Sequence, residues 1–126
     1  MQAQKTSVFW LSVALVYAAL LMYASLVRPE SLPDSKFMSY DKLLHFIAYA
    51  VEAFLLAKAF VKNLYIHLLA ITVFCFVLGV AIEWGQAAMQ QGRSYEYTDI
   101  AANTLGIVFG AFVYLKQLNL QKWISH

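Results

Sequence analysis

The stretch SVFWLSVALVYAALLMYASLV, residues 7–27, decides the fold class because its 21 residues include no charged side chain. An α-helix rises about 1.5 Å per residue, so this segment is long enough to cross a hydrocarbon layer of roughly 30 Å. The stretch is longer than the apolar core of a signal peptide and lacks a clear A-x-A cleavage site, which indicates an uncleaved signal-anchor helix. Arg28 and Pro29 end it.

The composition of the whole chain agrees with a membrane protein. Of the 126 residues, 62% are hydrophobic and 13% are charged, whereas soluble proteins are roughly half apolar and a quarter charged. This length predicts one domain, residues 1–126. The net charge of +2, without a basic patch, argues against a nucleic-acid partner. A single cysteine, Cys75, excludes an intrachain disulfide.

The apolar segments predict an all-α fold, an integral membrane four-helix bundle. Its helices are expected at about residues 7–27, 42–61, 64–83 and 99–115. The second span is the weakest because Glu52 interrupts it and Lys58 lies near its end. The residues between the first two spans, those before the fourth span and those after it are predicted to be polar loops and a tail at the membrane interface.

Four spans place both termini on one side of the membrane. Five Lys and Arg residues fall on the side of the termini and four on the other side, where they are diluted by acids. Since basic residues are enriched on the cytoplasmic side, both termini are predicted to be cytoplasmic and the two long polar loops to face outward. We therefore expect a multi-pass protein of the bacterial cytoplasmic (inner) membrane.

Polar residues within the predicted spans recur at helical spacing. In the second helix Asp41, His45, Tyr49 and Glu52 are spaced by four, four and three, so one face carries all of them. In the fourth helix the same face carries an acid, an amide and two glycines, at Asp99, Asn103, Gly106 and Gly110. On the third helix one side carries Cys75, Gly79, Glu83 and Gln86.

Ionisable groups at membrane depth normally turn toward the interior of the bundle or toward a water-filled cavity. We therefore expect the three polar faces to meet near the outer leaflet as an outward-facing polar pocket. Lys42 and Arg93 are available to neutralise the acids, and Gly106 and Gly110 are expected to close the helices together below the pocket.

Simpler structural roles remain open for most of these residues. Asp41 and Asp99 could each cap the N-terminus of a helix. Glu83, Arg93 and the neighbouring amides could be a hydrogen-bonding network that only holds the bundle together. Glu52 lies near mid-membrane, without a partner that the sequence identifies.

Three segments, in this order, resemble the VanZ-like family of small bacterial membrane proteins: DKLLHFIAY (41–49), EWGQ (83–86) and GRSYEYTDIAANTLGIVFG (92–110). The family pattern is D-K-x-x-H-x-x-x-Y, then E-x-x-Q, then an arginine followed by D-x-x-x-N-x-x-G-x-x-x-G. The positions that match it are Asp41, Lys42, His45, Tyr49, Glu83, Gln86, Arg93, Asp99, Asn103, Gly106 and Gly110.

The resemblance covers about residues 41–110, and Glu52 has no counterpart in the pattern. The family is named for a member linked to low-level teicoplanin resistance, and most members have no established biochemical activity. The resemblance thus implies a multispan protein of the bacterial cytoplasmic membrane and leaves open whether this chain affects any antibiotic.

Binding at the outer leaflet is the first functional hypothesis. The expected ligand is a lipid headgroup, a lipid-linked envelope precursor or a lipophilic, teicoplanin-like glycopeptide antibiotic, held in an accessory or resistance role. The expected binding residues are Asp41, Lys42, His45, Tyr49, Glu83, Gln86, Arg93, Asp99 and Asn103. Besides the lipid bilayer, a homodimer is compatible with the sequence.

Two alternatives stay open. The first is a membrane enzyme acting on a lipid-linked envelope substrate, with His45, Glu83 and Asp99 as catalytic candidates or ligands. The standard catalytic and metal-binding signatures are missing from the sequence, so binding is favoured over catalysis and no metal or cofactor is assigned. The second alternative is a structural membrane adaptor whose polar residues only stabilise the bundle.

Overall fold

A computed structural model describes residues 2–26, 34–60, 64–89 and 97–124. These residues form four α-helices and contain no β-strand, so the prediction of an all-α fold is confirmed. The helices are α1 (Gln2–Leu26), α2 (Asp34–Ala59), α3 (Leu64–Met89) and α4 (Tyr97–Ile124).

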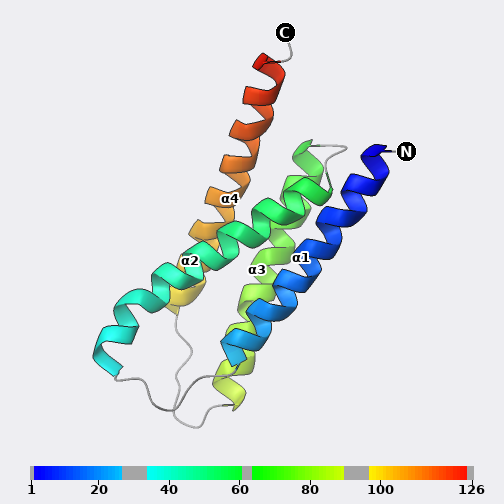
Figure 1. The fold of residues 1–126 in the computed structure, drawn as a ribbon. Coiled ribbons are helices and arrows are strands. Elements are labelled where there is room, and N and C mark those ends of the chain that lie inside the picture. Colours follow the sequence, from blue (N-terminus) through cyan, green and yellow to red (C-terminus); the bar gives the residue numbers. More distant parts are fainter. Residues whose placement is uncertain (1, 27–33, 61–63, 90–96, 125–126) are drawn as a thin grey trace.

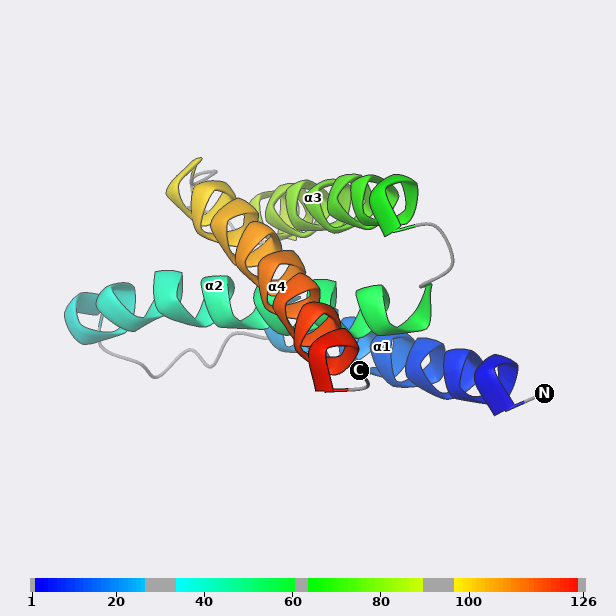
Figure 2. The same cartoon turned by 90° about the horizontal axis from the view of Figure 1, so that it is seen from above.

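The four helices alternate in direction, which brings the two ends of the chain to the same end of the bundle (Figure 1). Helices α2 and α3 each contact the other three helices, and α2 has the more extensive contacts. Its contact with α4 is the most extensive in the bundle, whereas α1 and α4 make no contact within the described residues. Figure 2 shows α4 crossing α2 obliquely. Helices α1 and α3 contact each other as well.

All four helices extend further than the sequence predicted, and α1 already begins at Gln2 instead of residue 7. Residues 34–40 were expected in a polar loop but belong to α2, residues 84–89 continue α3, and residues 116–124 continue α4. The predictions used hydropathy, which indicates where a chain leaves the apolar layer. A helix backbone can continue beyond the apolar layer, and none of the added residues is a proline that would interrupt it, so hydropathy underestimated the helix lengths.

Much of the bundle surface is apolar, as expected for a protein surrounded by lipid. Three helical segments are long and apolar enough to cross a membrane: Ser7–Ser25, Ile66–Met89 and Tyr97–Ile124. At most a third of each segment is buried within the bundle, and large side chains such as Val16, Phe74 and Leu105 are more than half exposed. The described chain therefore has the composition and the surface of a membrane protein.

Helix α2 is not among these three segments, although the second of the four expected spans lies within it. Asp41 and Lys42 near its outer end, together with Glu52 and Lys58, lower its hydropathy. The other helices cover some of its polar groups. Glu52, for example, is almost completely buried. Membrane crossing by α2 therefore stays a prediction. It requires the neighbouring helices to cover the polar side chains of α2.

Contacts with α1 hold the half of α2 that lies toward the chain termini. The Ser7 hydroxyl donates a hydrogen bond to the Ala59 carbonyl, and the Tyr17 hydroxyl donates one to the Ala48 carbonyl at 3.2 Å. The Lys58 ammonium lies 4.1 Å from the centre of the Trp10 ring, within the range of a cation–π interaction. These polar contacts supplement the apolar packing of α1 against α2.

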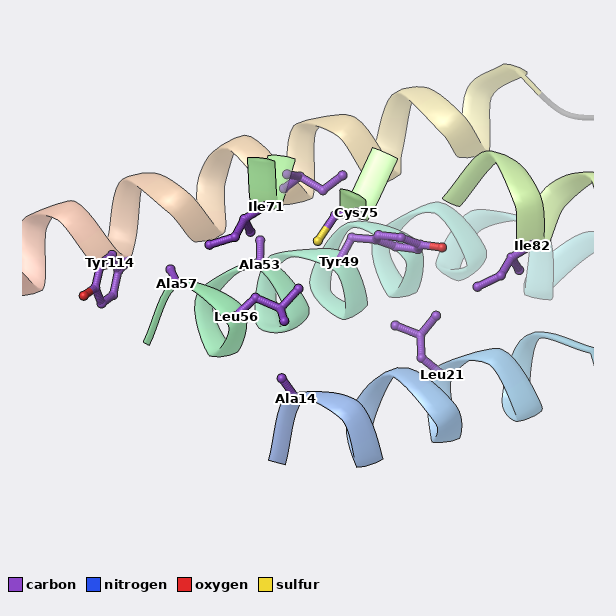
Figure 3. Close-up of a cluster of buried hydrophobic side chains, with 11 residues drawn as sticks. Ala14, Leu21, Tyr49, Ala53, Leu56, Ala57, Ile71, Cys75, Ile82 and Tyr114 are labelled. Atoms are coloured by element: carbon purple, nitrogen blue, oxygen red, sulfur yellow. The ribbon is translucent and has the colours of Figure 1, made fainter. Parts of the chain in front are cut away.

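The apolar core lies where α2 meets the other helices, and small residues dominate the α2 face. Figure 3 shows Ala53, Leu56 and Ala57 of α2 among side chains of α1 and α3, with the Tyr49 ring next to Cys75. Alanines allow helices to approach closely, and close packing replaces the hydrophobic effect as the main attraction between helices in lipid.

The crossing of α2 and α4 is closer still. A Cβ atom added at Gly106 would collide with the carbonyl oxygen of Phe46, and one added at Gly110 would collide with that of Ala50. The backbones of the two helices are therefore in direct contact over one helical turn. Such contact through a small-xxx-small sequence is a common way for membrane helices to associate.

The orientation of α2 can be tested by cysteine labelling in a Cys75→Ala background. Tyr40 and Phe60 are exposed residues near opposite ends of the helix. If α2 crosses the membrane, a membrane-impermeant maleimide added to intact cells should label Tyr40→Cys, whereas Phe60→Cys should react only after permeabilisation. Labelling of both variants in intact cells would contradict a membrane-crossing α2.

A larger residue at the helix crossing should destabilise the bundle. Replacing Gly106 with Ala should lower the free energy of unfolding by about 1–3 kcal/mol, because α2 and α4 must separate to admit the added methyl group. Thermal unfolding in detergent would measure the change. Ala101→Val, which adds bulk at an exposed position of the same helix, is the control and should have little effect.

Candidate functional site

Two residues near the start of α4 meet three residues of α2. The ammonium nitrogen of Lys42 lies 3.5 Å from Oδ1 of Asp99. The imidazole nitrogen Nδ1 of His45 lies 2.9 Å from Oδ1 of Asn103, and its other nitrogen, Nε2, lies 3.7 Å from Oδ1 of Asp41. We call these five residues the outer cluster, because the predicted topology places them toward the outside.

The helix crossing explains why these residues meet. Asn103 precedes Gly106 by three residues and Asp99 precedes it by seven, so both lie on the α4 face that touches α2. On α2, His45 directly precedes Phe46, whose carbonyl faces Gly106. The close backbone contact therefore brings polar side chains of α2 and α4 within reach of one another, one and two helical turns away from the crossing.

Burial is uneven across the outer cluster. The side chain of Asp99 is completely buried, whereas that of Lys42 is 38% exposed. Asp41 and His45 are intermediate, and Asn103 is buried. The cluster thus has a buried wall on α4 and a partly accessible side on α2.

The hydrogen bond to Asn103 orients the His45 ring. With Oδ1 of Asn103 as acceptor, Nδ1 of His45 carries the proton. Nε2 then lies on the side of the ring that faces Asp41. In addition, one ligand atom from each of Asp41, His45 and Asp99 lies within 4.8 Å of the other two, a spacing near that of ligands around a metal ion.

Deeper in the bundle, Gly79 of α3 leaves room for two polar side chains. A Cβ atom at position 79 would lie 3.2 Å from Nδ2 of Asn103 and 3.3 Å from Cε1 of Tyr49. Nδ2 of Asn103 and the hydroxyl of Tyr49 are buried and have no hydrogen-bond partner within the described residues. Glu83, one turn beyond Gly79, is buried within electrostatic range of the Tyr49 phenol.

Glu52 is, with Tyr49, one of the most buried polar residues of α2. It is 1% exposed, and one carboxylate oxygen, Oε2, has no hydrogen-bond partner among the described residues. The phenols of Tyr49 and Tyr17 lie within its electrostatic range. Glu52 is therefore separate from the outer cluster and belongs to the apolar interior.

Most of the sequence-predicted site residues lie along the contacts of α2 with α3 and α4. The structure brings Lys42 and Asp99, and His45 and Asn103, into direct contact, and it places Tyr49 beside Gly79 below them. The side chain of Gln86 and the whole of Arg93 lie outside the described residues. Whether any of these residues binds a ligand stays a prediction.

Sequence reasoning missed two features of this region. It grouped Gly79 with Glu83 on one side of α3 but gave it no role, whereas the structure shows that its missing side chain admits Tyr49 and Asn103. A glycine four residues before a buried acid, inside an apolar helix, was the available signal. It also did not identify Tyr17 as a contact of α2, and nothing in the α1 sequence distinguishes that tyrosine from Tyr23.

The fold and the outer cluster define a helical membrane protein whose polar side chains gather between two closely crossing helices. In a comparison with protein families, the VanZ/LLP1 family matches residues 6–120, and the chain belongs to this family. Comparisons with curated proteins and with solved structures give no match. The match extends beyond the three resembling segments to include most of α1 and of α4.

A double-mutant cycle can measure the contact between His45 and Asn103. His45→Ala and Asn103→Ala should together destabilise the protein by less than the sum of the single changes. The expected coupling energy is about 0.6 kcal/mol, because hydrogen bonds between membrane helices contribute roughly this much.

The control cycle pairs His45→Ala with Thr104→Ala, because the Thr104 hydroxyl donates a hydrogen bond within its own helix, to the Ile100 carbonyl. That pair should be additive. A coupling for His45 and Asn103 no larger than in this control would show that the contact contributes nothing to stability.

Proposed function

We propose that this VanZ/LLP1 family member is a binding protein that holds the polar headgroup of a lipid-linked envelope molecule at the outer leaflet. It would act as a multi-pass protein of the bacterial cytoplasmic membrane, in an accessory role. The single observation that carries the proposal is the outer cluster, in which partly exposed polar side chains of α2 lie against buried polar side chains of α4.

The chemistry of the exposed side of the cluster supports a headgroup ligand. Lys42 has more than a third of its side chain exposed, so its ammonium can contact a phosphate or another anionic group from outside. Asp41 and His45, which are partly exposed, offer an acceptor and a switchable donor for hydroxyl groups. Asp99, which is buried, orients Lys42 from below.

The surroundings of the cluster support a ligand that is itself a lipid. Exposed apolar side chains follow α2 and α4 directly below the outer cluster, including Ile47 and Leu105. A lipid whose headgroup occupies the cluster could place its hydrocarbon chain along this surface, which gains apolar contact that a soluble ligand would lack. A lipophilic glycopeptide, the other ligand considered from the sequence, would use the same two surfaces.

Catalysis on such a lipid is the second candidate, favoured by one observation. Nε2 of His45 faces Asp41 while Nδ1 is held by Asn103, an arrangement that resembles an oriented general base. Release of phosphate from a polyprenyl pyrophosphate by the wild-type protein, and its loss in His45→Ala, would favour an enzyme over a binding protein.

The binding proposal can be tested with the full chain in phosphatidylcholine nanodiscs that contain a polyprenyl phosphate. Lys42→Ala should weaken binding of this lipid about tenfold or more, because a hydrogen bond to a charged group contributes roughly 1.5–3 kcal/mol. Lys42→Arg should retain most of the affinity. Native mass spectrometry would measure the bound lipid.

Lys116→Ala is the matched control, because Lys116 lies toward the other end of α4, with its ammonium 5.6 Å from the centre of the Phe112 ring. It should bind the polyprenyl phosphate as the wild type does. Equal binding by Lys42→Ala and the wild type would refute headgroup binding at the outer cluster and would favour the structural role.

A further inference from the structure

Glu52 is an acid inside the bundle whose charge has no partner. It is 1% exposed, and within the described residues its carboxyl group makes no hydrogen bond or ion pair. Burying an isolated carboxylate is strongly unfavourable, and a group in this position normally takes up a proton and becomes neutral. The surroundings of Glu52 therefore decide whether it holds a charge or a proton.

The cation nearest to Glu52 along α2 is directed elsewhere. Lys58 lies six residues further on, and residues six apart lie on different faces of a helix. Its ammonium is 4.1 Å from the centre of the Trp10 ring of α1 and 5.2 Å from that of the Phe54 ring. Lys58 therefore interacts with aromatic rings, and it forms no ion pair with Glu52.

The titratable side chains around Glu52 are themselves weak acids. Those within its electrostatic range are Tyr17 of α1, Tyr49 of α2 and Cys75 of α3. The buried titratable residues of α4 are Asp99, in the outer cluster, and Tyr114, and Glu83 of α3 is a further buried acid. Phenols and thiols are uncharged at neutral pH and become negative when they lose a proton. None of these groups can offer Glu52 a positive charge, so a proton is the ligand that neutralises it.

Tyr49 lies between Glu52 and the outer cluster. It is three residues before Glu52 and four after the histidine of the outer cluster, on one face of α2. Its ring lies beside the Asn103 amide in the space that Gly79 leaves. Figure 3 shows its hydroxyl pointing away from Ala53, toward the outer end of the bundle. The Tyr49 ring therefore covers the interior of the bundle on the side of the outer cluster.

We propose that Glu52 is a proton-binding site inside the bundle, and that the Tyr49 ring separates this site from the outer cluster. The bound proton keeps the carboxyl group neutral, as an interior without a counter-charge requires. Acids within membrane helices are typical of proton pathways, in which they gain and lose a proton during function. Glu52 is buried by the bundle itself, whichever way α2 lies in the membrane.

Infrared spectroscopy of the full chain in phosphatidylcholine bilayers at neutral pH tests the bound proton. A protonated carboxyl group gives a C=O stretching band that an ionised carboxylate lacks. Glu52→Gln should remove one such band. It should also leave the bundle at least as stable to thermal unfolding as the wild type, because glutamine is neutral and of nearly the same size. Asp41→Asn, which removes a partly exposed acid of the outer cluster, should leave that band unchanged.

Exchange in D₂O tests the role of Tyr49, because the C=O band shifts when deuterium replaces the proton. In the wild type this shift should be slow. Tyr49→Ser leaves a cavity with polar walls that water can enter, so exchange should become faster by about tenfold or more. Tyr114→Ser is the matched control, because it truncates another buried tyrosine, toward the other end of α4. It should exchange as the wild type does. Tyr49→Phe keeps the ring and should do the same.

A C=O band that persists unchanged in the folded Glu52→Gln variant would overturn the proton site. Equal rates of exchange in Tyr49→Ser and Tyr114→Ser would overturn the role of Tyr49 as a barrier. A changed rate in Tyr49→Phe would also overturn it, and this variant decides the matter if Tyr49→Ser does not fold. Glu52 and Tyr49 lie outside the outer cluster, so neither result bears on headgroup binding there.

Discussion

The backbone contact between α2 and α4 is the constraint on which the rest of this structure depends. Gly106 and Gly110 bring α4 directly against the carbonyl oxygens of Phe46 and Ala50. This contact fixes the register of the two helices, and the register decides which polar residues meet beyond the crossing. The outer cluster is therefore a consequence of two missing side chains. Asn103 reaches His45 because Gly106, one turn away, has no Cβ atom.

Helix α2 combines the poorest hydropathy with the most central position. Its contact with α4 is the most extensive in the bundle, and Asp41 and Lys42 at one end are partly exposed whereas Glu52 is almost completely buried. In lipid, polar side chains are tolerated where neighbouring helices cover them. Helices α1, α3 and α4 expose long apolar faces, whereas α2 contributes three of the five residues of the outer cluster. This division of roles explains how a short chain keeps acids and a histidine within a membrane bundle.

The sequence was sufficient to predict the helical class and the faces on which polar residues lie. A charge-free run of 21 residues indicates a membrane-spanning helix. Polar residues that recur every three or four positions indicate one face of a helix. The individual side-chain contacts between helices could not be predicted, because they depend on the register of one helix against another. Lys42 adjoins Asp41 in sequence but approaches Asp99, 57 residues away. Helix ends were also missed, since residues 116–124 are too polar to mark a span yet contain nothing that ends a helix.

The separation of α1 from α4 has a consequence for how the protein is made. During synthesis α1 is made before α2, and α4 after it, so α2 exists before Asp99 and Asn103 are present to meet its polar side chains. Membrane insertion of a helix with such charged residues is unfavourable by itself. Helix α1 is the neighbour already present, and it contacts α2 through Tyr17, Ser7 and Trp10. Helix α1 is therefore the first of the neighbouring helices that α2 can pack against, and the outer cluster can form only after the start of α4 has been made.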